Sequence, residues 1–169
     1  MFHSPIWIKL SLLLLPFFYT SCYGKGKMGV AAMERMNLGT GEKIIRCISE
    51  KDSESLKNLF SEEAASTANL EKDIEKLFSY CDGKISDSKM RSTGTETEIA
   101  GKHNSTEYMT TFTFNLDDVP YLLYYKYTPK NTFDQKKEGV KSIQTVKESD
   151  DDRYFCYWED MGAGILAPD

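Results

Sequence analysis

Apolar residues recur with a helical period in the first half of this chain and with a strand period in the second half. The most regular helical stripe consists of Leu70, Ile74, Leu77, Phe78 and Cys81. This stripe predicts a helix, and Gly83 stands where a glycine commonly ends one. Shorter stripes within residues 44–48 and 56–60 predict two earlier helices.

Polar and glycine residues mark where the earlier helices should begin. Residues 28–38 are compatible with a helical lead-in that Gly39-Thr40-Gly41 is expected to break, with Thr40 capping the next helix. Asp52 or Ser53 is expected to cap the helix over residues 56–60 in the same way.

Period-two alternation begins after residue 83. Residues 84–99 are rich in Ser and Thr and fit a solvated strand, while residues 108–116 and 121–128 each place large apolar side chains on one face. A final long strand over residues 140–146 needs a β-bulge to bring Val140, Ile143 and Val146 to one face, and residues 154–158 fit a short edge strand.

Helices that precede a run of hairpins indicate an α+β domain. We therefore expect three N-terminal helices packed on one face of a curved antiparallel sheet. The folded domain is expected to span residues 40–169.

The first 21 residues have the pattern of a secretory signal. Lys9 is their one basic residue, and the apolar run over residues 10–18 is shorter than a membrane-spanning helix requires. Thr20 and Ser21 precede Cys22 as small residues do in lipoprotein signals, although Tyr19 stands where Leu is usual. The sequence thus predicts a signal peptide over residues 1–21, a lipid on Cys22, and a tether and lead-in over residues 22–39 on the outer face of the cell membrane. The alternative is an uncleaved or conventionally cleaved signal with an unmodified cysteine.

Charge and cysteine content exclude several classes of function. The net charge of −5 gives no electrostatic basis for binding nucleic acid. Three cysteines remain besides Cys22, namely Cys47, Cys81 and Cys156; they are expected to be buried thiols, although a disulfide between two of them stays open. No C-x-x-C spacing points to zinc, and His103 is the one histidine outside the signal, so no catalytic triad can be assembled. We expect no metal, cofactor or catalytic residue.

Aromatic residues gather in the predicted sheet and offer the best candidate ligand surface. The candidates are Tyr108, Phe112, Tyr121, Tyr124, Tyr125 and Trp158. Tyr and Trp combine flat apolar area with a polar tip, which suits a small apolar or sugar-like ligand. Alternation places Tyr124 on the face opposite Tyr125, and ordinary core packing is the competing explanation for the whole set.

Two segments resemble a known fold family. Residues 44–60, with the Lys51-Asp52 pair between two apolar stripes, resemble the opening of nuclear transport factor 2-like domains, and residues 136–146, which Gly139 enters, resemble their last strand. The chain over residues 40–147 is similar to a family of clostridial-type lipoproteins of unknown function, domain of unknown function 5104. The resemblance implies a cone-shaped fold with an open pocket between helices and sheet. It implies no activity, because a fold does not fix a function.

These observations together predict a lipid-anchored extracytoplasmic binding or interaction domain. Its expected partners are the membrane, a small ligand and a second copy docked through the sheet. The alternative is a cone-fold enzyme of the isomerase or dehydratase type, which would use a carboxylate in the pocket as its base.

Overall fold

The computed structural model describes residues 29–154, 157–166 and 168. Its helices are α1 (Val30–Glu50), α2 (Ser53–Lys57), α3 (Glu62–Ala65), α4 (Leu70–Tyr80) and α5 (Asp151–Tyr154), with 3-10 turns η1 (Gln135–Lys137) and η2 (Glu148–Asp150). Its strands are β1 (Ile85–Ala100), β2 (His103–Leu116), β3 (Val119–Thr128), β4 (Gly139–Lys147) and β5 (Gly164–Leu166). The predicted signal, the lipid site Cys22 and Cys156 lie outside the described residues.

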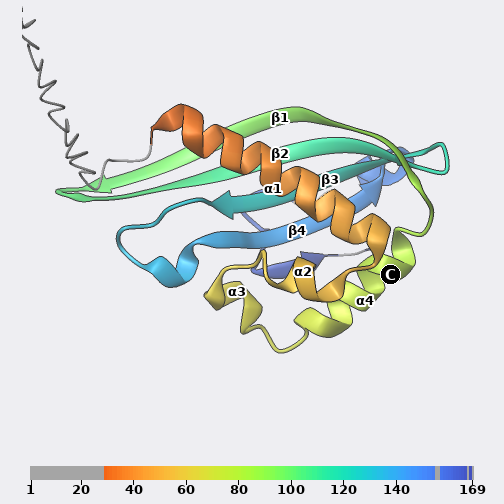
Figure 1. The fold of residues 1–169 in the computed structure, drawn as a ribbon, viewed down its shortest axis with the longest axis horizontal. Coiled ribbons are helices and arrows are strands. Elements are labelled where there is room, and N and C mark those ends of the chain that lie inside the picture. The colour runs from red at the N-terminus through yellow and green to blue at the C-terminus, as the bar shows by residue number, and fades with distance from the viewer. Residues whose placement is uncertain (1–28, 155–156, 167, 169) are drawn as a thin grey trace, which may run out of the picture.

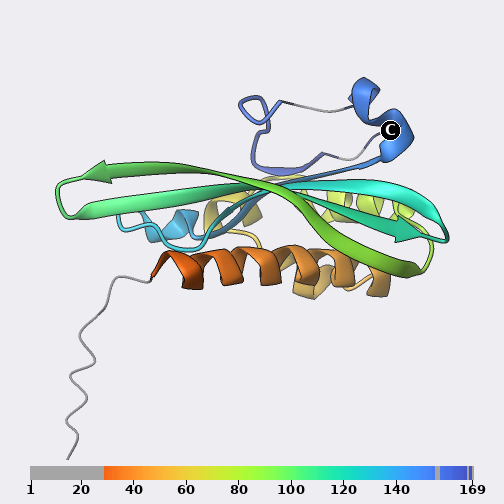
Figure 2. The ribbon, with the colours of Figure 1, turned by 90° about the horizontal axis from the view of Figure 1, so that it is seen from above.

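The strands form one open sheet in the order β1-β2-β3-β4-β5. The first four strands are antiparallel, and β5 runs parallel to β4. Helix α1 lies against one face of this sheet, and the C-terminal segment that carries α5 and β5 covers part of the other (Figures 1 and 2). We call the face toward α1 the inner face and the opposite one the outer face. The predicted α+β class, with helices first and a mostly antiparallel sheet after them, is confirmed.

Each sheet face has its own apolar cluster, as the alternation predicts. The inner cluster joins α1, α2 and α4 to Phe112, Phe114, Leu123, Tyr125 and Ile143. The outer cluster consists of Leu122, Tyr124, Val146 and Met161, with Trp158 and Leu166 packed against it. Strand neighbours such as Tyr124 and Tyr125 therefore belong to different clusters.

Helix α1 is continuous through the triplet that was expected to break it. The Thr40 hydroxyl donates a hydrogen bond to the Met36 carbonyl (2.8 Å) one turn earlier, so Thr40 belongs to the helix interior and caps nothing. A Cβ on Gly41 would lie 2.4 Å from a ring carbon of Phe112 and 2.9 Å from the Tyr125 hydroxyl. The expected break is wrong because glycine here lets the helix approach the sheet closely. Four helices precede β1 in the described chain, and the cap predicted at Asp52 is confirmed by its bond from the Ser55 amide (2.9 Å).

The C-terminal part of the sheet departs from expectation in two ways. A bulge is present in β4, since Val140 and Ser142 pair with consecutive residues of β3 and leave Lys141 as the extra residue. The bulge places Val140 and Ile143 in the inner cluster, but Val146 packs in the outer one. Of the strand expected at residues 154–158, Tyr154 instead ends α5 and Tyr157 and Trp158 belong to no strand, while residues 155–156 lie outside the described residues. The chain crosses the outer face after α5, where Met161 is buried, and it can then join the sheet only by running parallel to β4 as β5.

Two glycines of α1 should respond oppositely to alanine. We expect Gly41→Ala to lower the free energy of unfolding by about 1–3 kcal/mol, because the added methyl group overpacks against Phe112 and Tyr125. Gly39→Ala meets nothing within 4 Å and should raise it by roughly 0.5–1 kcal/mol through helix propensity. Urea denaturation of both variants checks this, and equal effects would contradict the close packing at Gly41.

Candidate functional site

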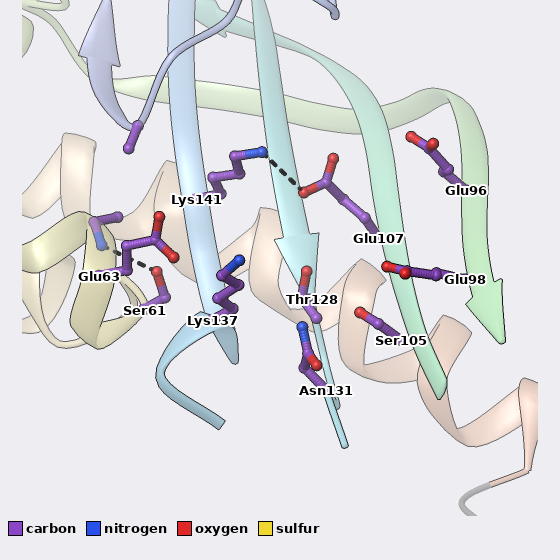
Figure 3. A pocket seen from close by; sticks show the side chains of 12 residues that line it. Ser61, Glu63, Glu96, Glu98, Ser105, Glu107, Thr128, Asn131, Lys137 and Lys141 are labelled. Atoms are coloured by element: carbon purple, nitrogen blue, oxygen red, sulfur yellow. Dashed lines mark hydrogen bonds and ion pairs between the residues drawn. The ribbon is translucent and has the colours of Figure 1, made fainter. Parts of the chain in front are cut away.

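A polar cavity of about 250 Å³ lies on the outer face, where β3 ends and β4 begins. Strand register accounts for its lining. Glu96 of β1 pairs with Glu107 of β2, and Glu98 pairs with Ser105. Tyr108, the next residue after Glu107, is buried on the inner face, so alternation places these four side chains on the outer face. Figure 3 shows them in front of the strands.

The wall opposite β1 comes from the start of β4 and from α3. Gly139 has a positive φ of 124°, and a Cβ there would lie 2.7 Å from the Ser61 amide nitrogen. This close approach is sealed by backbone bonds from the Ser61 amide to the Val140 carbonyl (2.9 Å) and from the Val140 amide to the Leu59 carbonyl (2.8 Å). Ser61 and Glu63 thereby reach the rim of the cavity.

Glu107 is the electrostatic centre of the site. One carboxylate oxygen lies 3.9 Å from the Lys126 ammonium, and the other lies 3.6 Å from the Lys141 ammonium. The Lys126 side chain is only 8% exposed and the Glu107 side chain 20%, so this pairing compensates a cation that is almost removed from water. Lys141 is the bulged residue of β4, which links the bulge directly to the site.

The loop between β3 and β4 supplies the floor. The Asn131 side-chain oxygen accepts hydrogen bonds from the amides of Phe133 and Asp134, both at 2.9 Å. The Asn131 amide donates to the Glu138 carboxylate (2.9 Å). Asn131 is thus nearly buried and fixed in place, and the cavity meets a preformed polar surface at this end.

The six aromatic candidates do not line this cavity. Phe112, Tyr121 and Tyr125 are buried in the inner cluster, and burial raises the pKa of Tyr121 to about 12. Tyr108 is also buried on the inner side of β2. The structure brings Phe112 and Tyr125 together in the inner cluster, with ring centroids 6.2 Å apart, and Tyr124 and Trp158 on the outer face, with ring centroids 5.7 Å apart.

Side chains therefore occupy the space between α1 and the inner face of the sheet around Tyr125. The Tyr125 hydroxyl donates to the Asn37 carbonyl of α1 (2.7 Å), and the Asn37 side chain bonds the Thr110 hydroxyl (2.9 Å). These contacts fill the space between α1 and the sheet around Asn37, on the face where the fold resemblance implied an open pocket. The cavity of Figure 3 lies on the other side of the sheet.

The cysteine and histidine candidates that the structure describes do not line the cavity. Cys47 and Cys81 are free buried thiols, as expected, and burial raises the pKa of Cys81 to about 12, which disfavours a thiolate at neutral pH. His103 is exposed, and its Nδ1 lies 2.8 Å from the Thr132 carbonyl oxygen. Among the described residues no group of three or more His, Cys, Asp or Glu side chains is placed to hold a metal ion. No described helix is both long and apolar enough to cross a membrane.

Sequence reasoning missed the charged residues that make the site. One signal was available, because Lys126 is the lone charge in the strongly apolar strand that runs from Val119 to Thr128. A buried lysine requires an acidic partner, and Glu107 is the acid on the adjacent strand. The register that joins them depends on the turn at residues 117–118, which alternation alone does not fix.

Comparison with known families gives one match. Residues 43–148 match the family described as a domain of unknown function (DUF5104), which agrees with the resemblance over residues 40–147. This range contains the C-terminal part of α1, helices α2–α4, and strands β1 to β4 with the charged residues Glu107, Lys126 and Lys141. No curated protein matches the chain.

The burial of Lys126 makes Glu107 important for stability. We expect Glu107→Gln to lower the free energy of unfolding by about 1–3 kcal/mol, because it leaves the Lys126 ammonium without its anionic partner. Glu98→Gln, in the same cavity but exposed, should change it by less than about 0.5 kcal/mol. Urea denaturation at pH 7 measures both, and a Glu107→Gln value as small as that of Glu98→Gln would contradict the role assigned to the ion pair.

Proposed function

We propose, from the premise that this chain belongs to the DUF5104 family, that it is a lipid-anchored extracytoplasmic binding domain whose outer-face cavity holds a small polar ligand. The observation that carries this proposal is the charged centre formed by Glu107, Lys126 and Lys141. Glu107 and Lys141 line the cavity, and the buried Lys126 holds the Glu107 carboxylate from beneath. Such a charge network provides fixed donors and acceptors, which is what orients a small ligand.

The chemistry of the cavity favours a ligand with both signs of charge. The carboxylates of Glu96 and Glu98 stand on one side, and the ammonium groups of Lys137 and Lys141 stand on the other (Figure 3). Ten of the twelve lining residues are polar, which disfavours the apolar ligand that the aromatic content suggested. A sugar-like ligand would meet hydrogen-bonding groups but none of the six aromatic candidates. An amino acid or a dipeptide, with an ammonium and a carboxylate, fits this lining best.

The volume limits the size of this ligand. Pockets for drug-sized molecules measure roughly 300–1,000 Å³, and this cavity of about 250 Å³ is smaller. We therefore propose a ligand no larger than a dipeptide. A longer peptide could enter only through one end, with the rest of its chain in solvent.

The proposed anchor at Cys22 would hold the cavity near the membrane. Helix α1 begins at the end of the molecule where β1 and β2 join, and Glu98 and Ser105 of the cavity lie close to that junction (Figure 1). Seven residues lie between Cys22 and Val30, and the eight Cα–Cα steps could span at most about 28 Å. This geometry supports the proposal that the domain acts at the outer face of the cell membrane. We propose the nuclear transport factor 2-like cone as the parent architecture, with its inner space filled by the aromatic core.

The enzymatic alternative would depend on Glu107. It is the largely buried carboxylate of the cavity, as an isomerase or dehydratase base would need to be. Both of its oxygens face ammonium groups, which suits a fixed charge better than a proton acceptor. Incubating the protein with alanylalanine in D₂O and following the ligand by NMR separates the two functions, because a base that abstracts the Cα proton exchanges it for deuterium, whereas binding alone leaves it in place.

Binding should appear as thermal stabilisation by a zwitterion. We expect alanylalanine at one hundred times its Kd to stabilise the protein by about 2.7 kcal/mol, seen as a rise in Tm. The N-acetylated and amidated dipeptide, which carries no charge, should leave Tm unchanged. Lys141→Gln should abolish the rise, whereas Lys130→Gln, exposed and outside the cavity, should retain it. Equal shifts with charged and blocked dipeptides, or none up to millimolar concentrations, would count against the proposed ligand.

Lipid attachment is tested separately from the cavity. We expect the full chain expressed in a bacterium to fractionate with membranes and to carry an acyl mass on Cys22. Cys22→Ser should lack this mass and leave the membrane fraction, while Cys47→Ser, which alters a buried thiol, should keep both properties. A Cys22→Ser protein that still fractionates with membranes would refute the anchor.

A further inference from the structure

Strand β1 is a long edge strand with one side open. It spans 16 residues, all of which are exposed except for the half-buried Ile85, and it pairs only with β2 among the described strands. An edge of this length presents a row of unpaired backbone N–H and C=O groups that can accept another strand. Its charged side chains decide which strand that can be.

The charges of β1 are segregated along its length. Lys89 and Arg91 lie in the first half, which also holds Asp87 near its start, and Glu96 and Glu98 lie in the second half. Arg91 already pairs with Glu148 of η2 (3.2 Å), but no ion pair within the described chain involves Lys89, Glu96 or Glu98. The strand therefore has a net positive charge in its first half and a net negative charge in its second half.

A bulge brings these charges to one face. Met90 pairs with Phe112 and Ser92 pairs with Thr111, which leaves Arg91 as the extra residue. The bulge shifts the alternation by one position. Lys89, before the bulge, and Glu98, after it, consequently both point to the outer face despite the odd spacing between them.

We propose that β1 pairs antiparallel with β1 of a second copy of this chain, about a two-fold axis at Gly94. With Gly94 opposite itself, Glu96 lies opposite Ser92 and beside Arg91. In each half of the dimer, the bulge at Arg91 of one copy shifts the alignment by one position, so Glu98 of the other copy lies opposite Lys89. The two residues of each opposed pair then lie on the same face of the sheet. The two-fold axis repeats the attraction between Glu98 and Lys89, so it occurs twice in the dimer. A parallel in-register pairing would instead set like charges opposite one another, which is destabilising.

Gly94 is suited to a position on the two-fold axis. It presents no side chain where two copies would meet, and a Cβ added there would have its nearest contact at 3.8 Å, with the Met109 side chain. The site therefore tolerates a small residue. The resulting dimer would continue the sheet from one copy into the other and leave both outer faces on the same side. Glu96 and Glu98 also line the proposed ligand cavity, so the dimer contact would lie beside that cavity.

Cysteine cross-linking tests the axis directly. In membranes that contain the full chain, we expect Gly94→Cys to give an oxidised dimer, because residues opposed in antiparallel strands lie within reach of a disulfide. Thr97→Cys is the matched control, since its two copies would lie about 20 Å apart. It should give no more dimer than the unmodified chain. Absence of the Gly94→Cys dimer, or an equal yield from Thr97→Cys, would overturn the proposal.

Charge exchange tests the register. In the Gly94→Cys background, Lys89→Glu and Glu98→Lys should each reduce the dimer yield roughly fivefold, because two attractive pairs become repulsive. The double exchange should restore it. Thermal unfolding of each variant verifies the fold, and a double variant that folds but stays as low as the single ones would overturn the pairing. Ligand binding is not measured in either experiment, so failure here leaves the proposed function standing.

Discussion

The close approach of α1 to the sheet is the constraint on which the rest of this structure depends. At Gly41 the helix backbone comes so near to Phe112 and Tyr125 that a single methyl group would not fit. One turn earlier, Asn37 fixes the helix to the sheet through the Tyr125 hydroxyl and Thr110. Buried polar groups require such partners, so these bonds set both the position and the rotation of α1.

This packing limits where the proposed ligand could bind. The inner face is used by the helices and its aromatic residues are consumed in the core, so the outer face remains. The C-terminal segment covers one part of that face by packing Met161 and Trp158 on Leu122 and Tyr124. The polar cavity around Glu107 occupies the uncovered end. The outer-facing side chains of β3 change in the same way along the strand. Apolar Leu122 lies under the C-terminal segment, and charged Lys126 lies at the cavity end.

The sequence predicted the elements whose cause is local. Three of these elements depend only on residues within one segment, and all three are present. They are the apolar stripe of α4, the cap at Asp52, and the alternation of β2 and β3. The triplet at Gly39–Gly41 was misread because glycine ends a helix in one context and allows close packing in another, and only the position of Phe112 distinguishes them. The parallel β5 likewise depends on where the chain crosses the sheet.

The candidate site was harder to predict because it too depends on contacts between segments that are far apart in the sequence. Glu107, Lys126 and Lys141 come from three strands, and they meet only through strand register and a bulge. Aromatic residues, which are easier to notice in a sequence, pack mainly in the core. Composition therefore pointed to an aromatic binding surface, whereas the fold assembles a charged one.

The most direct test of the account is NMR mapping of alanylalanine on the isotopically labelled protein. The account predicts that amide shifts concentrate at the cavity, at Ser105, Glu107, Thr128, Asn131 and Lys141, while the amides around Tyr124 and Trp158 stay unchanged. Shifts centred on Tyr124 and Trp158, or no shifts at saturating dipeptide, would contradict the central claim that the charged outer-face cavity is the binding site.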